Sequence, residues 1–110
     1  MASKNPSLEF LSAFCDADLE RLETLLVEDL VFEGPLFRFD SRAAYLDGLR
    51  SSGLERASFE VLRSIRGDEQ EALLWEYRKA RGSLRISQWS RIRGGKIAEI
   101  VLVFDASGFR

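Results

Sequence analysis

The chain has 110 residues, of which 45% are hydrophobic, and a formal net charge of −2; it is long enough for one domain with its own core and lacks the positive charge of a bulk nucleic-acid binder. It has no histidine and one cysteine, Cys15, which excludes an internal disulfide, a cysteine metal site and a nucleophile activated by histidine. No apolar run could span a membrane, and the first residues lack a signal-peptide core. We expect one cytoplasmic domain over residues 1–110 with neither cofactor nor metal.

The first quarter of the chain predicts two short helices. Pro6 suits the first position of a helix. Apolar residues then recur at helical spacing: Leu8, Leu11, Phe14 and Cys15, with Phe10 beside them. Asp18 can cap a second helix, whose stripe is made by the leucines at 19, 22, 25 and 26.

The middle of the chain predicts two short strands, a helix and a long strand. Residues 30–33 form a strand that Gly34-Pro35 stops, and residues 36–39 alternate in a second one. Asp40-Ser41 starts a helix over residues 42–52, and Gly53 ends it. Residues 57–65 then form a strand, one face of which is made by Phe59, Val61, Arg63 and Ile65.

Residues 71–105 predict a three-stranded antiparallel meander with turns at Arg81-Gly82 and Gly94-Gly95. A two-residue first turn places Tyr77 opposite Ile86 and Trp75 opposite Gln88. Because side chains alternate between the faces of a strand, the mostly apolar inner face is then made by Leu73, Trp75, Tyr77, Lys79, Leu84, Ile86, Gln88 and Ser90. The outer face is mostly charged, apart from Leu74 and Trp89.

The order of these elements, with several stretches in them, resembles the nuclear transport factor 2-like superfamily, and within it the SnoaL-like and ketosteroid-isomerase-like proteins. The stretches are LEFLSAFCDADLERLETLL, EDLVFEGP, SRAAYLDGL and WSRIRGGKIAEIVLVFD. The resemblance implies a cone-shaped α+β fold in which a curved, mostly antiparallel sheet wraps about three N-terminal helices. It also implies an internal apolar pocket open at one end and, in many members, a dimer formed through the back of the sheet.

The catalytic positions of the family are not matched in this chain. Ketosteroid isomerases have a tyrosine on the first helix, and the corresponding residue here is Phe10. Their catalytic base, just before the proline, corresponds to Gly34, and the acid on a late strand corresponds to Gln88 or its neighbour. SnoaL-type cyclases use an acid and a histidine, and this chain has no histidine. Epoxide hydrolases of this fold use an Asp-Arg-Asp set. The nearest partial match in this chain, Glu76 with Arg78, lies on the predicted outer face. We therefore expect no catalytic residues of the known kinds.

Two sets of residues are candidates for function. The expected pocket lining, which shares its walls with the core, is Phe10, Phe14, Phe32, Tyr45, Trp75, Tyr77, Gln88, Ser90, Leu102 and Phe104. The last strand, residues 96–105, is apolar on both faces, which predicts an outer apolar strip where a homodimer would form. This outer strip consists of Leu74, Arg85, Trp89, Arg91, Val101 and Val103.

Three functions stay open at this point. The first is a protein that binds a small hydrophobic molecule; the second is an isomerase, dehydratase or cyclase with an unusual set drawn from Tyr45, Tyr77, Gln88 and Asp40. The third is an interaction module on the outer face. Seven basic and no acidic residues lie between Arg78 and Lys96, which we interpret as a solvated face rather than an RNA-binding stripe. The expected partners are thus a small hydrophobic molecule and a second copy of the chain, not a membrane or a nucleic acid.

Overall fold

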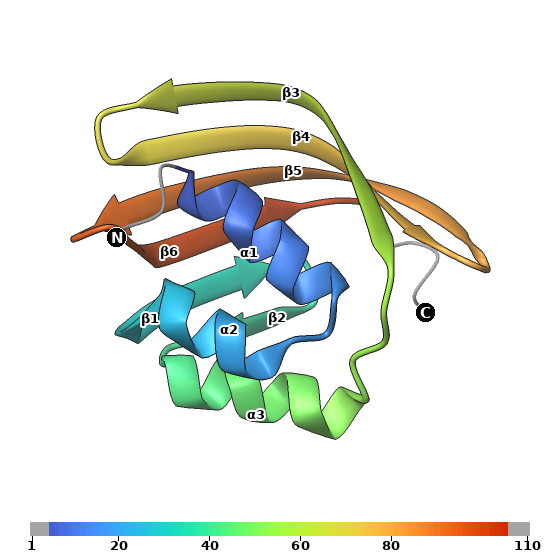
Figure 1. Cartoon of the computed structure of the whole chain (residues 1–110), viewed down its shortest axis with the longest axis horizontal. Helices are drawn as coiled ribbons and strands as arrows, with labels where there is room; N and C mark the ends of the chain where they lie inside the picture. Colours follow the sequence, from blue (N-terminus) through green and yellow to red (C-terminus); the bar gives the residue numbers. More distant parts are fainter. Residues whose placement is uncertain (1–4, 106–110) are drawn as a thin grey trace.

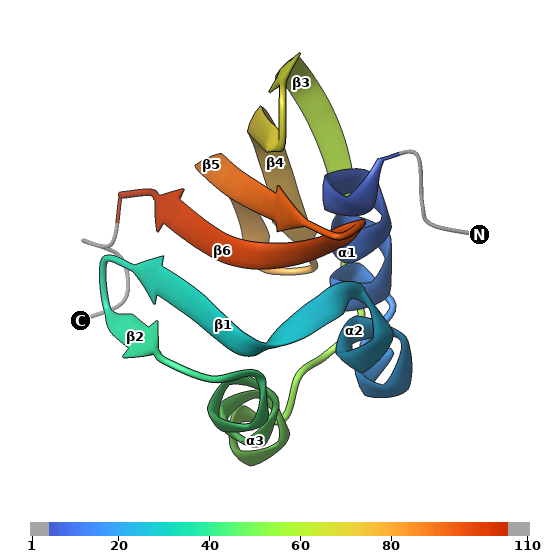
Figure 2. The same ribbon diagram turned by 90° about the vertical axis from the view of Figure 1, so that its left-hand side faces the viewer.

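The computed structural model describes residues 5–105, which form three helices and one six-stranded sheet. The elements are α1 (Pro6–Cys15), α2 (Leu19–Leu25), β1 (Leu26–Gly34), β2 (Phe37–Phe39), α3 (Arg42–Ser52), β3 (Ser58–Gly67), β4 (Gln70–Lys79), β5 (Gly82–Arg93) and β6 (Lys96–Val103). The strand order is β2-β1-β6-β5-β4-β3; β1 and β6 are parallel and the other neighbours antiparallel. The expected α+β fold with a curved sheet around three helices is confirmed (Figures 1 and 2).

The helices begin and end where the sequence places their caps. Asn5 Oδ1 accepts a hydrogen bond from Leu8 N at 3.2 Å, and Asp18 Oδ1 accepts one from Arg21 N at 3.1 Å. Ser41 caps α3, and Gly53 ends it with the left-handed φ of 71° that a glycine adopts without strain. No helix of the described residues is long and apolar enough to cross a membrane.

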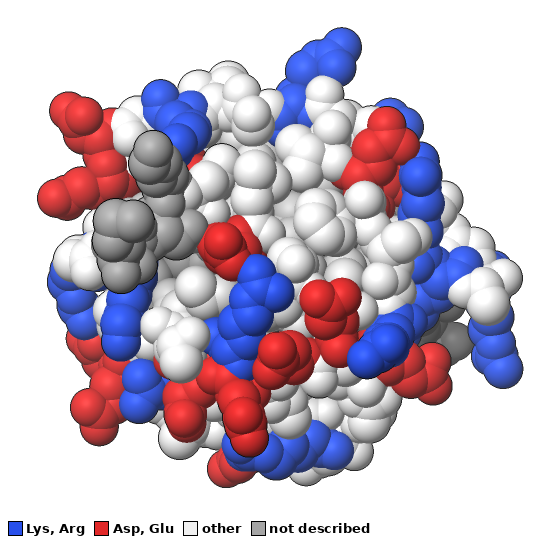
Figure 3. All heavy atoms as spheres, in the orientation of Figure 1, with Lys and Arg blue, Asp and Glu red and all other residues white. Residues whose placement is uncertain are grey.

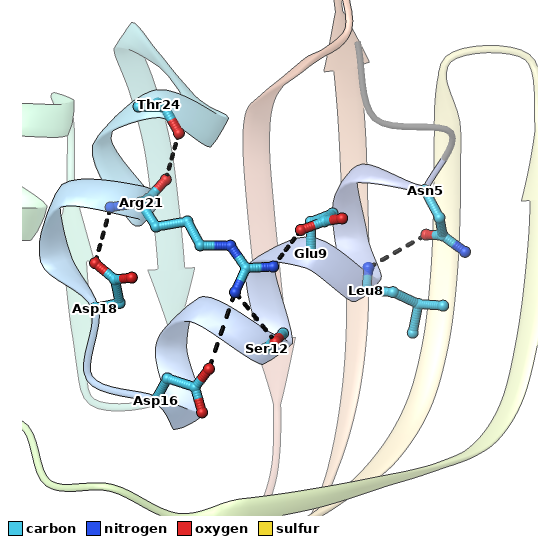
Figure 4. A network of polar contacts seen from close by, with 8 residues as sticks. All are labelled: Asn5, Leu8, Glu9, Ser12, Asp16, Asp18, Arg21 and Thr24. Carbon is cyan, nitrogen blue, oxygen red and sulfur yellow. Dashed lines mark hydrogen bonds and ion pairs between the residues drawn. The ribbon is translucent and has the colours of Figure 1, made fainter. Parts of the chain in front are cut away.

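The first two helices are joined by the guanidinium of Arg21 on α2. It forms an ion pair with Glu9, donates to Ser12 Oγ at 3.3 Å and lies 3.9 Å from Asp16 Oδ2 (Figure 4). Such half-exposed ion pairs contribute about 0–1 kcal/mol each. The network therefore links α1 to α2 but contributes little to the stability of the fold.

The first helices and the first strand differ in detail from the sequence prediction. On α1, Phe10 and Leu11 are buried whereas Leu8 is 37% exposed, so the buried stripe is rotated away from Leu8. Strand β1 begins at Leu26, four residues earlier than expected, because Leu26 pairs with Ile97 on β6 and is fully buried there. The second helix accordingly ends at Leu25.

The register between β4 and β5 is shifted by two residues from the predicted one. Tyr77 pairs with Leu84 and Trp75 with Ile86, so the turn is at Ala80-Arg81. Because side chains alternate with a period of two, this even shift leaves every residue on its predicted face. The inner residues of the two strands are buried at their centres, as expected for Leu73, Trp75, Ile86, Gln88 and Ser90.

Strand β3 changes faces at a bulge. The register shifts between Val61 and Arg63, where Leu62 is the extra residue. Phe59 and Val61 therefore face inward, but Arg63 and Ile65 face outward, and Ile65 is 74% exposed. The prediction that these four side chains share one face was wrong.

Candidate functional site

A cavity of about 170 Å³ lies between α1 and the inner face of the sheet. Its wall is apolar and is lined by Phe10, Phe14, Phe32, Phe37, Trp75, Tyr77, Leu84, Ile86, Gln88, Leu102 and Phe104. Figure 2 shows α1 lying against the concave side of the curved sheet. The space is large enough for a small organic molecule.

Aromatic rings make most of this wall. Phe10 and Phe14 are four residues apart on α1, which places them on one helix face, and their ring centroids are 6.1 Å apart. Trp75 and Tyr77 alternate inward on β4 with centroids 5.8 Å apart, and Phe14 lies 5.7 Å from Tyr77. Helical and strand periodicity thus converge on one aromatic enclosure.

Three polar side chains at the centre of the inner face, Trp75, Gln88 and Ser90, form hydrogen bonds with one another. Trp75 Nε1 donates to Gln88 Oε1 at 3.2 Å, and Gln88 Nε2 donates to Ser90 Oγ at 3.3 Å. All three residues are buried. Gln88, itself a lining residue, therefore accepts the hydrogen bond that the buried indole needs.

The structure brings together most of the predicted lining. Tyr45 and Ser90 are the exceptions: both are fully buried but lie outside the wall. The Tyr45 ring stacks on Phe32 at 4.3 Å, and its hydroxyl has no hydrogen-bond partner among residues 5–105. The other predicted residues line the cavity: Phe10, Phe14, Phe32, Trp75, Tyr77, Gln88, Leu102 and Phe104.

Three lining residues were not among the candidates. Leu84 and Ile86 lie on the predicted inner face and could have been included on that ground. Phe37 could not, because its position depends on Gly34. A Cβ added at Gly34 would lie 2.7 Å from the Phe37 ring, so the ring occupies the space of the missing side chain.

The ionisable groups around the cavity are poorly suited to proton transfer near neutral pH. Among the described residues that line the cavity, Tyr77 is the only acid or base, and burial raises the pKa of its hydroxyl. Burial also raises the pKa of the nearby Tyr45, and raises that of the Cys15 thiol to about 11, with Asp16 adding to it. No group of three or more potential metal ligands occurs within residues 5–105.

The other residues that the sequence offered as possible catalytic groups lie away from the cavity. Arg78 Nε donates to Glu76 Oε1 at 2.8 Å on the outer face, where the sequence predicted this pair. Asp40 is exposed and accepts from Arg38 Nε at 3.1 Å. Figure 3 shows basic and acidic side chains interspersed around the helix-bearing side of the molecule, with an uncharged area between them.

The outer strip lies on the convex face of the sheet. Trp89 is half-buried, and its Nε1 donates to Gln70 Oε1 at 3.0 Å. Cross-strand pairing continues the strip sideways from Val101 through Trp89 to Ala72 and Ile65. Arg85 and Arg91 flank it and form ion pairs with Glu76 and Glu99 at 3.7 and 3.3 Å, while Leu74 is half-buried and Val103 is 62% exposed.

Comparison with solved structures shows the fold. The chain resembles an NTF2-like protein of unknown function from Cytophaga hutchinsonii (16% identity, TM-score 0.81, 94% of this chain and 90% of that one). It also resembles a protein with a ketosteroid isomerase-like fold from Catenulispora acidiphila (13%, 0.76, 91% and 85%) and an LEH-like epoxide hydrolase of M. tuberculosis (17%, 0.74, 92% and 80%).

The sequence itself shows the family. No curated protein matches it significantly. The model of the SnoaL-like domain matches residues 8–100, which cover α1 from its third residue, α2 and α3 entirely, and the sheet up to the middle of β6. The chain therefore belongs to the SnoaL-like domain family, whose NTF2-like fold also serves isomerases and epoxide hydrolases.

Proposed function

We propose that this protein binds a small molecule whose buried part is an uncharged, apolar ring. The observation that carries the proposal is the apolar aromatic cavity of about 170 Å³. An apolar cavity of about 150 Å³ engineered into another protein stays dry and binds benzene. A single ring with a short substituent matches the space available here.

Binding without catalysis is favoured by the chemistry of the wall. The family's oxyanion donor and base fall on Phe10 and Gly34, which cannot donate or accept a proton through a side chain. Gln88 is engaged with Trp75 and Ser90. An acid–base enzyme needs a group with a pKa near the working pH, and Tyr77, with its raised pKa, is not such a group.

The proposal can be tested with ethylbenzene as a probe in ligand-observed NMR and thermal unfolding. Saturable binding and a rise in melting temperature are expected, since a ligand that binds only the folded state stabilises it. Leu84→Trp should abolish both effects by filling the cavity from its half-buried rim. Leu36→Trp is the matched control, because Leu36 is 56% exposed and outside the wall. Equal binding by both variants would contradict the proposal.

We also propose that two copies pair through the outer strip, back to back. The support is a row of apolar side chains on the outer sheet face, from half-buried Val101 and Trp89 to Ile65, which is 74% exposed. Aromatic and arginine side chains around an apolar centre are typical of protein interfaces. A two-fold contact would cover each strip with its own copy.

A further inference from the structure

The inward-facing residues of β4 become more exposed toward one end of the cavity. Trp75 is 2% exposed, Tyr77 is half-buried, and Lys79, the next residue on the same face, is exposed. On β5, Ile86 is likewise buried and Leu84 half-buried. The cavity therefore opens toward the β4–β5 turn, and Lys79 is the first charged residue beyond the wall on this face of β4.

The side chain of Lys79, although exposed, folds back over the ring of Tyr77. Its Nζ lies 5.4 Å from the centroid of the Tyr77 ring, a cation–π contact with a residue of the wall. The ammonium is also close enough to the Tyr77 hydroxyl to lower its pKa, against the larger effect of burial and against Cys15 and Glu55, which raise it. Lys79 thus places a positive charge at the cavity rim.

This ammonium has no counter-ion within the part of the chain that the structure describes. The neighbouring arginines do: Arg78 pairs with Glu60 and Glu76, and Arg85 pairs with Glu76. No carboxylate of residues 5–105 forms an ion pair with Lys79. A cation that is held at a rim and lacks a carboxylate partner is suited to the anionic end of a ligand.

We propose that the ligand carries a carboxylate on a short tail and that Lys79 selects for it. The inference rests on the proposed function, because the apolar ring must occupy the cavity for the tail to reach the rim. Lys79 Nζ lies 5.4 Å from the centroid of the Tyr77 ring, so a tail of about three or four carbons lets the carboxylate of a ring packed beside Tyr77 meet the ammonium. Longer ring systems with the same tail would exceed the cavity volume of about 170 Å³.

The test compares 4-phenylbutyrate with 4-phenylbutanol, which has the same ring and chain length but no charge, by titration calorimetry. The wild type should bind the carboxylate about threefold to fivefold more tightly at low salt, as expected for one partly exposed ion pair. Raising the salt concentration to about 1 M should remove the preference through screening. Lys79→Gln should bind both compounds with the affinity that the wild type has for the alcohol.

Three variants separate this role from a general effect of charge. Arg81→Gln removes an exposed cation from the adjacent turn and should leave the preference unchanged. Lys79→Arg should retain it, and Glu55→Gln should increase it slightly by removing the carboxylate whose charge reaches Tyr77. If the alcohol binds but the wild type shows no preference, or if Lys79→Gln keeps the preference, this inference is overturned while the proposed function stands. If neither compound binds, both are overturned.

Discussion

The substitution Gly34→Ala tests whether the Phe37 ring occupies the space that a side chain at position 34 would need. In ketosteroid isomerases this position corresponds to the catalytic base. The new Cβ would lie 2.7 Å from Phe37 Cε1 and Cζ, too close for any real contact. Those atoms are the far end of a side chain that is already 37% exposed, so the ring can swing outward. The cost is then its packing against Phe32 and Phe39, at centroid distances of 5.7 and 6.0 Å.

The size of the effect follows from these contacts. Two aromatic pairs contribute about 0.5–1.5 kcal/mol each, and replacing glycine with alanine in a compatible backbone returns about 0.4–1 kcal/mol by restricting the unfolded chain. We expect Gly34→Ala to lower the free energy of unfolding by about 1–2 kcal/mol. In a Phe37→Ala background the clash is absent, so the same substitution should raise it by about 0.4–1 kcal/mol.

Urea unfolding followed by far-ultraviolet circular dichroism measures all four chains of this double-mutant cycle. The sign of the Gly34→Ala effect should reverse when Phe37 is truncated. An equal loss of stability in both backgrounds would refute the reasoning, because it would mean that the backbone rather than the ring resists the added carbon.

If the protein pairs as we propose, Trp89→Glu should sediment as a monomer at micromolar concentration and keep the circular dichroism spectrum; a wild type that sediments as a monomer would contradict the pairing. Burial raises the pKa of Cys15 from 9.0 to about 11. Alkylation at pH 8 should therefore be slower than in the unfolded chain, and the free energy of unfolding should fall as pH rises from 9 to 11, because the unfolded thiol ionises first. No turnover of an unsaturated ketosteroid is expected, because Phe10 and Gly34 supply neither donor nor base; activity that copurifies with the protein would disprove this.

The faces of β4 and β5 were predictable from the sequence because they depend only on the alternation of side chains along an uninterrupted strand. The turn lies at Ala80-Arg81, which moves the register by two residues. Trp75 and Ile86 nevertheless remain inward, because an even shift does not exchange the faces. The bulge at Leu62 was not predictable, because no glycine or proline marks it. It depends on how β3 bends along β4, which is a property of the assembled sheet.

The cavity was predictable only in part because two of its features require three-dimensional contacts. Tyr45 has the periodicity of an inward residue, but Phe32 stacks on it and separates it from the space. In the sequence, Phe37 lies in a short strand whose side chains alternate between two faces, and this pattern does not place it in the wall. Its position there depends on its proximity to Gly34. Local sequence patterns predict which face a residue lies on, but not whether it borders the cavity or lies behind another side chain.

The arrangement of polar atoms limits what this site can discriminate. The indole of Trp75 donates its hydrogen bond to Gln88, and the amide of Gln88 donates to Ser90. The wall therefore presents mainly carbon atoms to a ligand bound there. An apolar pocket distinguishes ligands that differ by one methylene by only about 1–3 kcal/mol. Shape can therefore choose the ring, but it cannot enforce a particular functional group. Any strong chemical selectivity has to come from the rim, where Tyr77 and Lys79 carry the polar atoms nearest to the opening on β4.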